Sequence, residues 1–190
     1  MKILGITGSP RRGGNTNRLL AEVLRGAADK GAVVKTIFLD NLDISACHHC
    51  DACFVAGECI INDDMQMVYC ELAETDAIVL ASPIHFSGVT AQTKAMIDRC
   101  QALWARKYIL NIAPLGNLRP RKGLFVSVGG QKEERFFEPA LATVKSLFIS
   151  LDIEYAGKIV FPAVDDINAI SRQPEAIKQA YLVGQKLVAG

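Results

Sequence analysis

The chain has 190 residues, of which 50% are hydrophobic and 22% charged, so it is long enough for one domain with a sizeable core. Its 21 Lys and Arg residues against 20 Asp and Glu residues leave a formal net charge of +1, which argues against a strongly basic nucleic-acid binder and an acidic disordered tail. No apolar run approaches the roughly 18 residues of a membrane span, and the first residues lack the layout of a signal peptide. We therefore expect a cytoplasmic protein with neither a nucleic-acid nor a membrane partner.

Strand and helix patterns alternate from one end of the chain to the other. Strand segments are short runs rich in apolar and β-branched residues, whereas helix segments repeat apolar residues at spacings of three and four. We expect strands at 2–8, 33–39, 77–83, 123–128 and 154–161. We expect helices at 15–31, 63–74, 90–105, 137–148 and 174–188, with a cysteine-rich segment at 41–62 and a loop at 106–119. On the helix at 90–105, the charged residues Lys94, Asp98 and Arg99 are expected on a solvent face.

Five strand–helix units with no internal repeat predict a single α/β domain over residues 1–190, built on a doubly wound parallel sheet of five strands with helices on both faces. The run 77–83 is apolar throughout, as a central strand buried on both sides must be. A closed eight-stranded barrel is excluded, because it needs about 250 residues. Open sheets of this kind bind ligands beyond the carboxyl ends of their strands. The candidate site loops are therefore 8–15, 40–62, 83–90 and 128–135.

The loop after the first strand, residues 8–17, predicts an anion site. Its small residues let backbone N–H groups approach an anion, the following helix adds its N-terminal dipole, and Arg11 can pair with a phosphate. Short polar side chains can add hydrogen bonds: Ser9, Asn15, Thr16 and Asn17. The loop has neither the Gly-Lys-Ser/Thr of a P-loop nor G-x-G-x-x-G, and one cradle suits a monophosphate better than a pyrophosphate. The alternative is a Gly-rich turn that caps a helix beside solvated arginines.

The segment 47–59 carries four cysteines in the spacing C-x2-C-x2-C-x5-C. Two-residue gaps let successive thiolates converge on one compact centre, and iron–sulfur clusters often take four thiolates from such tight runs. Structural zinc sites usually use two pairs separated by a dozen or more residues, but His48 and His49 keep zinc as an alternative, and free or redox-active thiols are another. The four candidate ligands are Cys47, Cys50, Cys53 and Cys59. The other two cysteines, Cys70 and Cys100, fall on predicted helices and are expected to be buried structural thiols.

Three loops together resemble the flavin site of the NADPH-dependent FMN reductase group of flavodoxin-like proteins: GSPRRGGNTNRLL at 8–20, ASPIHFSGVTAQTKAMIDR at 81–99 and VSVGGQ at 126–131. The resemblance covers about residues 1–165 and implies FMN as the cofactor. It implies that the phosphate is held by Ser9, Arg11, Asn15, Thr16 and Asn17. It implies that the isoalloxazine ring is lined by Pro83, Ile84, His85, Phe86 and Gly88, and that Ser127, Gly129 and Gly130 close over it. His85 stands where relatives often carry tyrosine.

The pairing of these loops with the cysteine segment is similar to the iron–sulfur flavoproteins, whose compact cysteine motif holds a [4Fe–4S] cluster beside FMN. This resemblance implies an oxidoreductase that passes electrons between cluster and FMN, with no catalytic side chain, because the cofactors supply the chemistry. It also implies a donor such as NAD(P)H or ferredoxin, an acceptor such as a quinone, and a homodimer or homotetramer. One alternative is an NAD(P)H-dependent FMN or quinone reductase without a cluster. The other is a binding protein with a flavodoxin-like fold, in which a metal ion bound by the cysteines has only a structural role.

Overall fold

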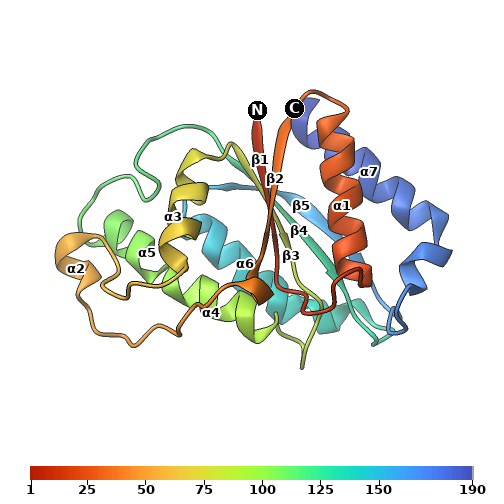
Figure 1. The fold of residues 1–190 in the computed structure, drawn as a ribbon, viewed down its shortest axis with the longest axis horizontal. Coiled ribbons are helices and arrows are strands. Elements are labelled where there is room, and N and C mark those ends of the chain that lie inside the picture. Colours follow the sequence, from red (N-terminus) through yellow and green to blue (C-terminus); the bar gives the residue numbers. More distant parts are fainter. Residues whose placement is uncertain (190) are drawn as a thin grey trace.

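The computed structural model describes residues 1–189 and contains one sheet of five strands in the order β2-β1-β3-β4-β5 (Figure 1). Every neighbouring pair of strands is parallel. The strands are β1 (Lys2–Thr7), β2 (Val33–Phe38), β3 (Ala77–Ala81), β4 (Lys122–Val128) and β5 (Glu154–Phe161). This is the flavodoxin-like order, in which the direction of winding reverses between β1 and β3 and opens a crevice at their carboxyl ends. The predicted α/β fold is confirmed.

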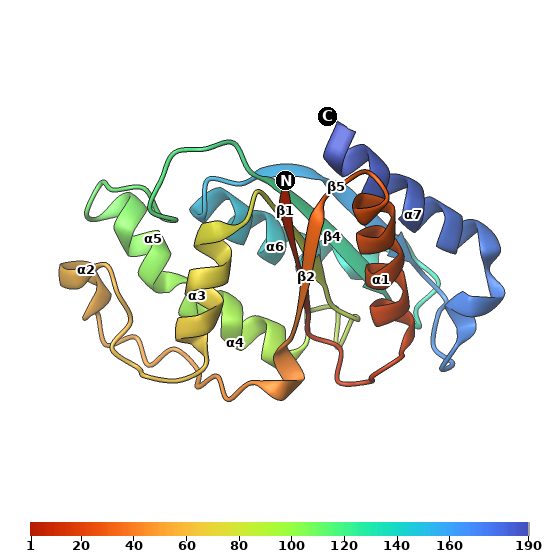
Figure 2. The same cartoon turned by 45° about the horizontal axis from the view of Figure 1, so that its top comes forward.

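Helices cover both faces of the sheet. On one face lie α1 (Asn15–Ala28) and α7 (Pro174–Ala189), and on the other lie α3 (Met65–Glu74), α4 (Ala91–Arg99), α5 (Gln101–Tyr108) and α6 (Glu138–Ser150). The short helix α2 (Cys53–Ala56) stands at the end of the molecule furthest from α7, as Figure 2 shows. Three 3₁₀ helices complete the chain: η1 (Leu39–Asn41), η2 (Glu134–Phe137) and η3 (Ala169–Arg172). Among residues 1–189, none of the helices has the length and apolar character that a membrane span needs.

Each layer of helices packs on the sheet through its own apolar core. Phe125 and Phe148 are fully buried in the core beneath α3, α4 and α6, whereas Leu19 and Val23 lie in the core beneath α1 and α7. All five residues of β3 are buried, because the strand is central and covered on both faces. The two cores fix the strands rigidly, so the loops at their carboxyl ends start from well-defined positions.

The helix expected at 90–105 is two helices that meet at Cys100. The N–H of Cys100 is shared between the carbonyls of Met96 and Ile97, at 3.2 and 3.0 Å, which marks the end of regular α-helical bonding in α4. The second helix, α5, continues to Tyr108, so the first part of the loop expected at 106–119 is helical. Arg106 and Lys107 favour this extension, because cations stabilise the last turn of a helix.

Candidate functional site

A cavity of about 340 Å³ lies at the carboxyl ends of β1, β3 and β4. Its walls come from the three loops that the sequence singled out as flavin-like, together with Val164 and Asp165 after β5. Nine of the predicted site residues line it: Ser9, Arg11, Asn15, Thr16, Pro83, Ile84, His85, Gly129 and Gly130. Asp165 was not anticipated, because no local motif marks it and only the position of β5 in the sheet brings it to this cavity.

The loop between β1 and α1 is shaped by its own backbone. The N–H of Gly14 donates to the carbonyl of Arg11 at 2.9 Å, and the side-chain amide of Asn17 donates to the same carbonyl at 3.0 Å. Gly14 is the N-cap of α1 and supplies no side-chain oxygen, so the first N–H groups of this helix lack the usual capping acceptor. A helix start of this kind beside Arg11 is suited to an anion.

Asn15 is held by contacts inside the protein. Its side-chain amide donates to the carbonyl of Asp166 at 2.8 Å, and its Oδ1 accepts from the N–H of Ile170 at 3.1 Å. Asn15 therefore fastens the start of α1 to the segment before α7. Its side chain is already engaged, and the group that remains for an anion is its backbone N–H.

The loop after β3 forms a tight hairpin. His85 and Gly88 exchange backbone hydrogen bonds of 3.0 and 2.9 Å, and the two residues between them, Phe86 and Ser87, have positive φ values of 50° and 62°. This is the conformation of a two-residue hairpin turn with both central residues left-handed, which is costly for a bulky side chain such as phenylalanine. Phe86 is fully exposed at the tip and borders a neighbouring cavity of about 440 Å³ with Phe136.

Two further residues of the predicted flavin site lie behind the cavity wall. The hydroxyl of Ser127 is buried and donates to the carbonyl of Ser82 at 2.7 Å. Gly88 closes the hairpin through its backbone bonds with His85. In this structure Ser127 and Gly88 position the loops that carry the lining residues.

The four cysteines of the segment 47–59 line a second, small cavity of about 20 Å³. Cys50 is exposed and the other three are half-buried. Burial raises the pKa of the Cys53 thiol, and the charges on the other three thiols add to this increase. Among residues 1–189, no three His, Cys, Asp or Glu side chains are arranged to hold one metal ion. The thiols are therefore neighbours around one space without meeting at a single point.

The walls of this second cavity include Arg99, which is buried rather than on the expected solvent face. Both of its terminal nitrogens bond to the carboxylate of Asp63, at 2.6 and 3.0 Å. The apolar spacing of α4 explains the burial, because Arg99 follows the buried Met96 by three residues and lies on the same helix face. Lys94 and Asp98 pair with each other on the exposed face, as expected.

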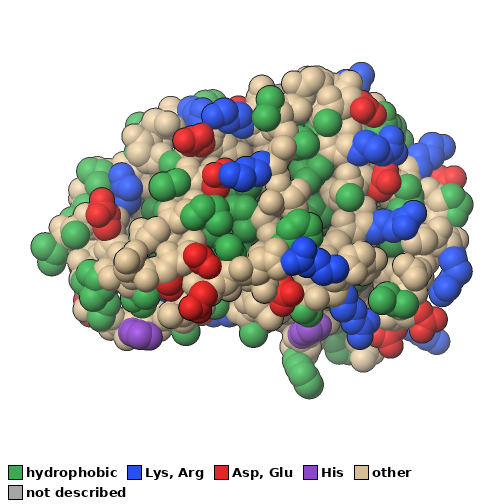
Figure 3. All heavy atoms as spheres, in the orientation of Figure 1, with side chains coloured by type: hydrophobic (Ala, Val, Ile, Leu, Met, Phe, Trp, Pro, Cys, Tyr) green, Lys and Arg blue, Asp and Glu red, His purple; other side chains and the backbone are tan. Residues whose placement is uncertain are grey.

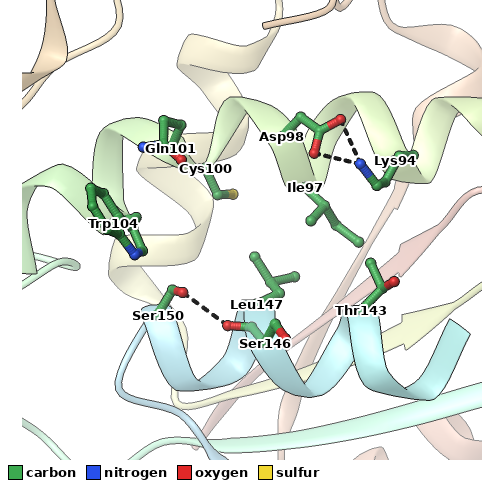
Figure 4. A pocket seen from close by; sticks show the side chains of 10 residues that line it. All are labelled: Lys94, Ile97, Asp98, Cys100, Gln101, Trp104, Thr143, Ser146, Leu147 and Ser150. Carbon is green, nitrogen blue, oxygen red and sulfur yellow. Dashed lines mark hydrogen bonds and ion pairs between the residues drawn. The ribbon is translucent and has the colours of Figure 1, made fainter. Parts of the chain in front are cut away.

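The remaining two cysteines differ from each other. Cys100 is buried, and burial raises the pKa of its thiol to about 12, so it is the structural thiol that was predicted. Cys70 is exposed, which corrects the prediction, because the buried face of α3 is formed by Met65, Val68 and Leu72. Figure 4 shows Cys100 beside a groove of about 330 Å³ between α4–α5 and α6, where Ile97 and Leu147 face each other.

Known proteins with similar sequences are flavin reductases and iron–sulfur flavoproteins. A family model described as NADPH-dependent FMN reductase matches residues 1–146. An iron–sulfur flavoprotein of Methanosarcina thermophila is 33% identical over 132 residues, which cover 70% of this chain and 65% of the relative. An iron–sulfur flavoprotein of Archaeoglobus fulgidus is 39% identical over 130 residues, which cover 68% of this chain and 63% of the relative. The matched region is thus under two thirds of the length of these two relatives. An iron–sulfur flavoprotein of Methanocaldococcus jannaschii is 36% identical over 150 residues, which cover 78% of this chain and 71% of the relative.

Solved structures resemble the fold over nearly the whole chain. A flavone reductase superimposes with a TM-score of 0.76 at 23% identity, covering 100% of this chain and 62% of that one. An NAD(P)H:quinone oxidoreductase from Methanothermobacter marburgensis gives a TM-score of 0.71 at 14% identity, covering 98% and 96%. The family model covers most of the chain, and the M. jannaschii relative is matched over more than two thirds of both chains, so the chain belongs to the NADPH-dependent FMN reductase family and, within it, to the iron–sulfur flavoproteins.

Proposed function

We propose that this chain is an FMN-dependent oxidoreductase that passes electrons between a [4Fe–4S] cluster and FMN. The observation that carries the proposal is the presence, in one chain, of an anion-type cavity at the switch point of the sheet and a separate cavity lined by four cysteines. Bound FMN would supply both one-electron and two-electron chemistry, and the cluster would supply one-electron chemistry.

The first cavity fits FMN. The FMN phosphate would receive hydrogen bonds from the backbone N–H groups at the uncapped start of α1 and from Ser9 and Thr16, while Arg11 would neutralise its charge. The ring would lie against Ile84 and His85 of the hairpin. Gly129 and Gly130 would line the facing wall.

The donor set of the second cavity favours a cluster over a zinc ion, because iron–sulfur clusters often take four thiolates from one tight run. A structural zinc ion needs four ligands at one point, within about 2.3 Å of the metal for sulfur. In a [4Fe–4S] cluster each thiolate binds a different iron, so the four sulfurs stand further apart. Here four thiols from one short segment line one cavity of about 20 Å³, which would have to widen to hold a cluster. This arrangement supports Cys47, Cys50, Cys53 and Cys59 as cluster ligands.

The electron partners follow from the flavin cavity and its neighbour. The adjoining cavity of about 440 Å³ has an aromatic wall that includes Phe86 and Phe136, which suits a flat apolar acceptor such as a quinone. The structural neighbour from M. marburgensis is an NAD(P)H:quinone oxidoreductase, which is in keeping with this acceptor and with a nicotinamide donor. Reduced ferredoxin is the other donor that we propose. Its electrons would enter through the exposed side of the cysteine segment.

Assembly into a homodimer or homotetramer would bring the two kinds of site together. Within one chain the two cavities share no lining residue: the N-cap of α4 bonds to Gly8, next to the first cavity, whereas the last residue of α4 lines the second. Hydrophobic side chains gather on the surface at the α2 end of the molecule (Figure 3), where Val55 and Ile60 are exposed beside the cysteine cavity. An exposed apolar surface of this kind favours contact with a second copy.

The free thiols favour a reducing, cytoplasmic location.

The test is anaerobic purification followed by iron, sulfide and FMN analysis of three proteins: the wild type, Cys53→Ser and Cys70→Ser. We expect about four irons and one FMN per wild-type chain, and a brown absorption that dithionite bleaches. Cys53→Ser should lose the iron and keep the FMN. Cys70→Ser is the matched control, because Cys70 is an exposed thiol outside the cavity, and it should keep both. Stoichiometric FMN without iron in the wild type, even after reconstitution, would overturn the cluster half of the proposal.

The alternative is an NAD(P)H-dependent FMN or quinone reductase without a cluster. The small volume of the cysteine cavity favours it. This alternative predicts a yellow protein whose steady-state oxidation of NADPH by a quinone is unchanged in Cys53→Ser. A wild type that contains iron and loses quinone reduction on Cys53→Ser substitution excludes it.

A further inference from the structure

Arg99, the last residue of α4, closes the cysteine segment by binding both of its ends. Its Nη1 donates to the carbonyl of Ser45 at 3.0 Å, before the first cysteine. Its Nη2 donates to the carbonyl of Ile61 at 3.2 Å, after the last cysteine. One guanidinium therefore fixes how far apart the ends of the segment lie.

Asp63 holds this guanidinium in place. Its Oδ2 also accepts from the N–H of Ser45 at 2.9 Å, and its Oδ1 accepts from the N–H of Met65 at 3.1 Å. Burial alone would raise the pKa of Asp63 and lower that of Arg99. Their mutual hydrogen bonds, the backbone N–H groups on Asp63 and the neighbouring charges together outweigh burial, so the pKa of Asp63 is lowered and that of Arg99 is raised. Both groups are charged, and a buried ion pair is by itself weak evidence of a stabilising role.

Of the Asp63–Arg99 ion pair, the positively charged Arg99 is the residue that borders the cysteine cavity. Arg99 lines the cavity together with the four cysteines, whereas Asp63 does not. The Arg99 guanidinium also lies near the Cys59 thiol, which contributes to its raised pKa. Its Nε is buried and has no hydrogen-bond partner within residues 1–189, which is rare for a buried donor. The wall of the cavity thus carries a fixed positive charge, and the same side chain keeps one unused N–H donor.

We propose that Arg99 is a positioning residue for an iron–sulfur cluster in this cavity, which holds the ends of the cysteine segment and stabilises the reduced cluster by its charge. This inference rests on the proposed function. One electron from the donor makes the cluster more negative by one charge, and no bond to Arg99 forms or breaks. A cation and N–H donors beside the cluster favour the more negative form, because hydrogen bonds and net charge set the potential of such clusters.

The test compares Arg99→Gln, which removes the charge, with Arg99→Lys, which keeps it. Arg121→Gln is the matched control. Arg121 is also buried, at 2% exposure, and donates to the backbone carbonyls of Ala73 and Thr75, but it does not line the cysteine cavity. Iron and sulfide per chain are measured first, and the midpoint potential of the cluster is then obtained by anaerobic redox titration.

At a fixed solution potential we expect at least a tenfold smaller ratio of reduced to oxidised cluster in Arg99→Gln, which corresponds to about 59 mV for one electron. Arg99→Lys should recover most of this loss, and Arg121→Gln should leave the ratio at the wild-type value. An unchanged ratio in Arg99→Gln, or an equal change in Arg121→Gln, would overturn the inference. If Arg99→Gln binds no iron, Arg99→Lys decides: iron uptake supports the inference, and loss of iron equal to that in Arg99→Gln overturns the charge argument.

Limited proteolysis separates failure of this inference from failure of the proposed function. If the wild type binds no cluster under any condition, the cluster proposal fails but the positioning role is still testable. Arg99→Gln should then be cleaved within residues 45–61 at least tenfold faster than the wild type and Arg121→Gln. Equal cleavage rates in the three proteins would overturn the positioning role as well.

Discussion

The hydroxyl of Thr90 donates to the backbone carbonyl of Gly8 at 2.8 Å, and this bond joins the loop after β1 to the start of α4. Thr90 is the N-cap of α4, and its Oγ1 also accepts from the N–H of Thr93 at 3.3 Å. The N–H of Thr90 donates to the hydroxyl of Ser82 at 3.0 Å. One buried threonine therefore connects the loop proposed to hold the phosphate with the hairpin proposed to hold the ring.

Replacing Thr90 with valine should weaken both stability and FMN binding. The change keeps the shape of the side chain but leaves the carbonyl of Gly8 and the N–H of Thr93 without their partner. We expect the free energy of unfolding to fall by about 1–3 kcal/mol, and FMN affinity to fall about tenfold. Denaturant unfolding and quenching of FMN fluorescence measure the two effects. Thr143→Val is the control: Thr143 donates to the carbonyl of Pro139 at 3.0 Å on the exposed side of α6, and its loss should change stability by less than about 0.5 kcal/mol.

Gly8 should not tolerate a side chain. A Cβ at this position would lie 1.8 Å from Oγ1 of Thr93 and 2.6 Å from Oγ1 of Thr90, so the loop would have to move. We expect Gly8→Ala to reduce FMN affinity more than tenfold. Adding Thr93→Ala removes the nearest atom, and the double variant should bind FMN better than the sum of the two single losses implies. Strict additivity of the two changes in a binding titration would contradict this steric explanation.

The two adjacent arginines of the first loop should behave differently. Arg11 lines the flavin cavity, whereas Arg12 bonds to the side chain of Asn41 and lies 5.2 Å from the ring of Phe38. Arg11→Gln should weaken FMN binding about tenfold, or about 1.4 kcal/mol, and reduce its dependence on salt. Riboflavin, which lacks the phosphate, should bind the wild type and this variant alike. An equal effect of Arg12→Gln on FMN binding would show that the first arginine has no specific role.

The Asp63–Arg99 pair should give the protein a component of stability that is lost in acid. The pKa of Asp63 is below its ordinary value of 3.8, so the unfolded chain binds a proton more readily than the folded chain. The stabilisation is therefore complete above about pH 5 and declines as the pH falls through the lower pKa of the folded protein. Urea unfolding of the wild type and Asp63→Asn at a series of pH values measures this. The difference in unfolding free energy should be constant from pH 7 to 5 and shrink below pH 3.8. A difference that stays constant down to pH 2.5 would contradict the assignment.

The sheet and the flavin-type cavity were predictable because they depend on local patterns and one topological rule. Short apolar runs located all five strands, and the carboxyl ends of adjacent parallel strands must meet at one edge. Loops 75 residues apart in the chain, such as those of Gly8 and Pro83, are therefore brought together by the order of the strands. The hairpin at Phe86 was not predictable, since nothing in Pro83–Ser87 demands two left-handed residues.

Contacts over long sequence separations account for most of what was missed. Arg99 was assigned to the surface because arginine is usually exposed, although its spacing from Met96 placed it on the buried face of α4. Its partner Asp63 is 36 residues away, and no local pattern pairs the two. The amide of Asn15 was expected on the phosphate, but its partners lie 151 and 155 residues further along the chain. Chemistry of this kind depends on tertiary packing and cannot be read from a segment.

Helix α4 runs from the threonine that holds the flavin loops to the arginine that closes the cysteine segment. Each residue of a helix advances it by about 1.5 Å and turns it by about 100°. Deleting or inserting one residue in α4 would therefore rotate Arg99 away from the cavity while Thr90 stayed in place. The nine residues of this helix therefore cannot change in number during evolution without uncoupling the two sites.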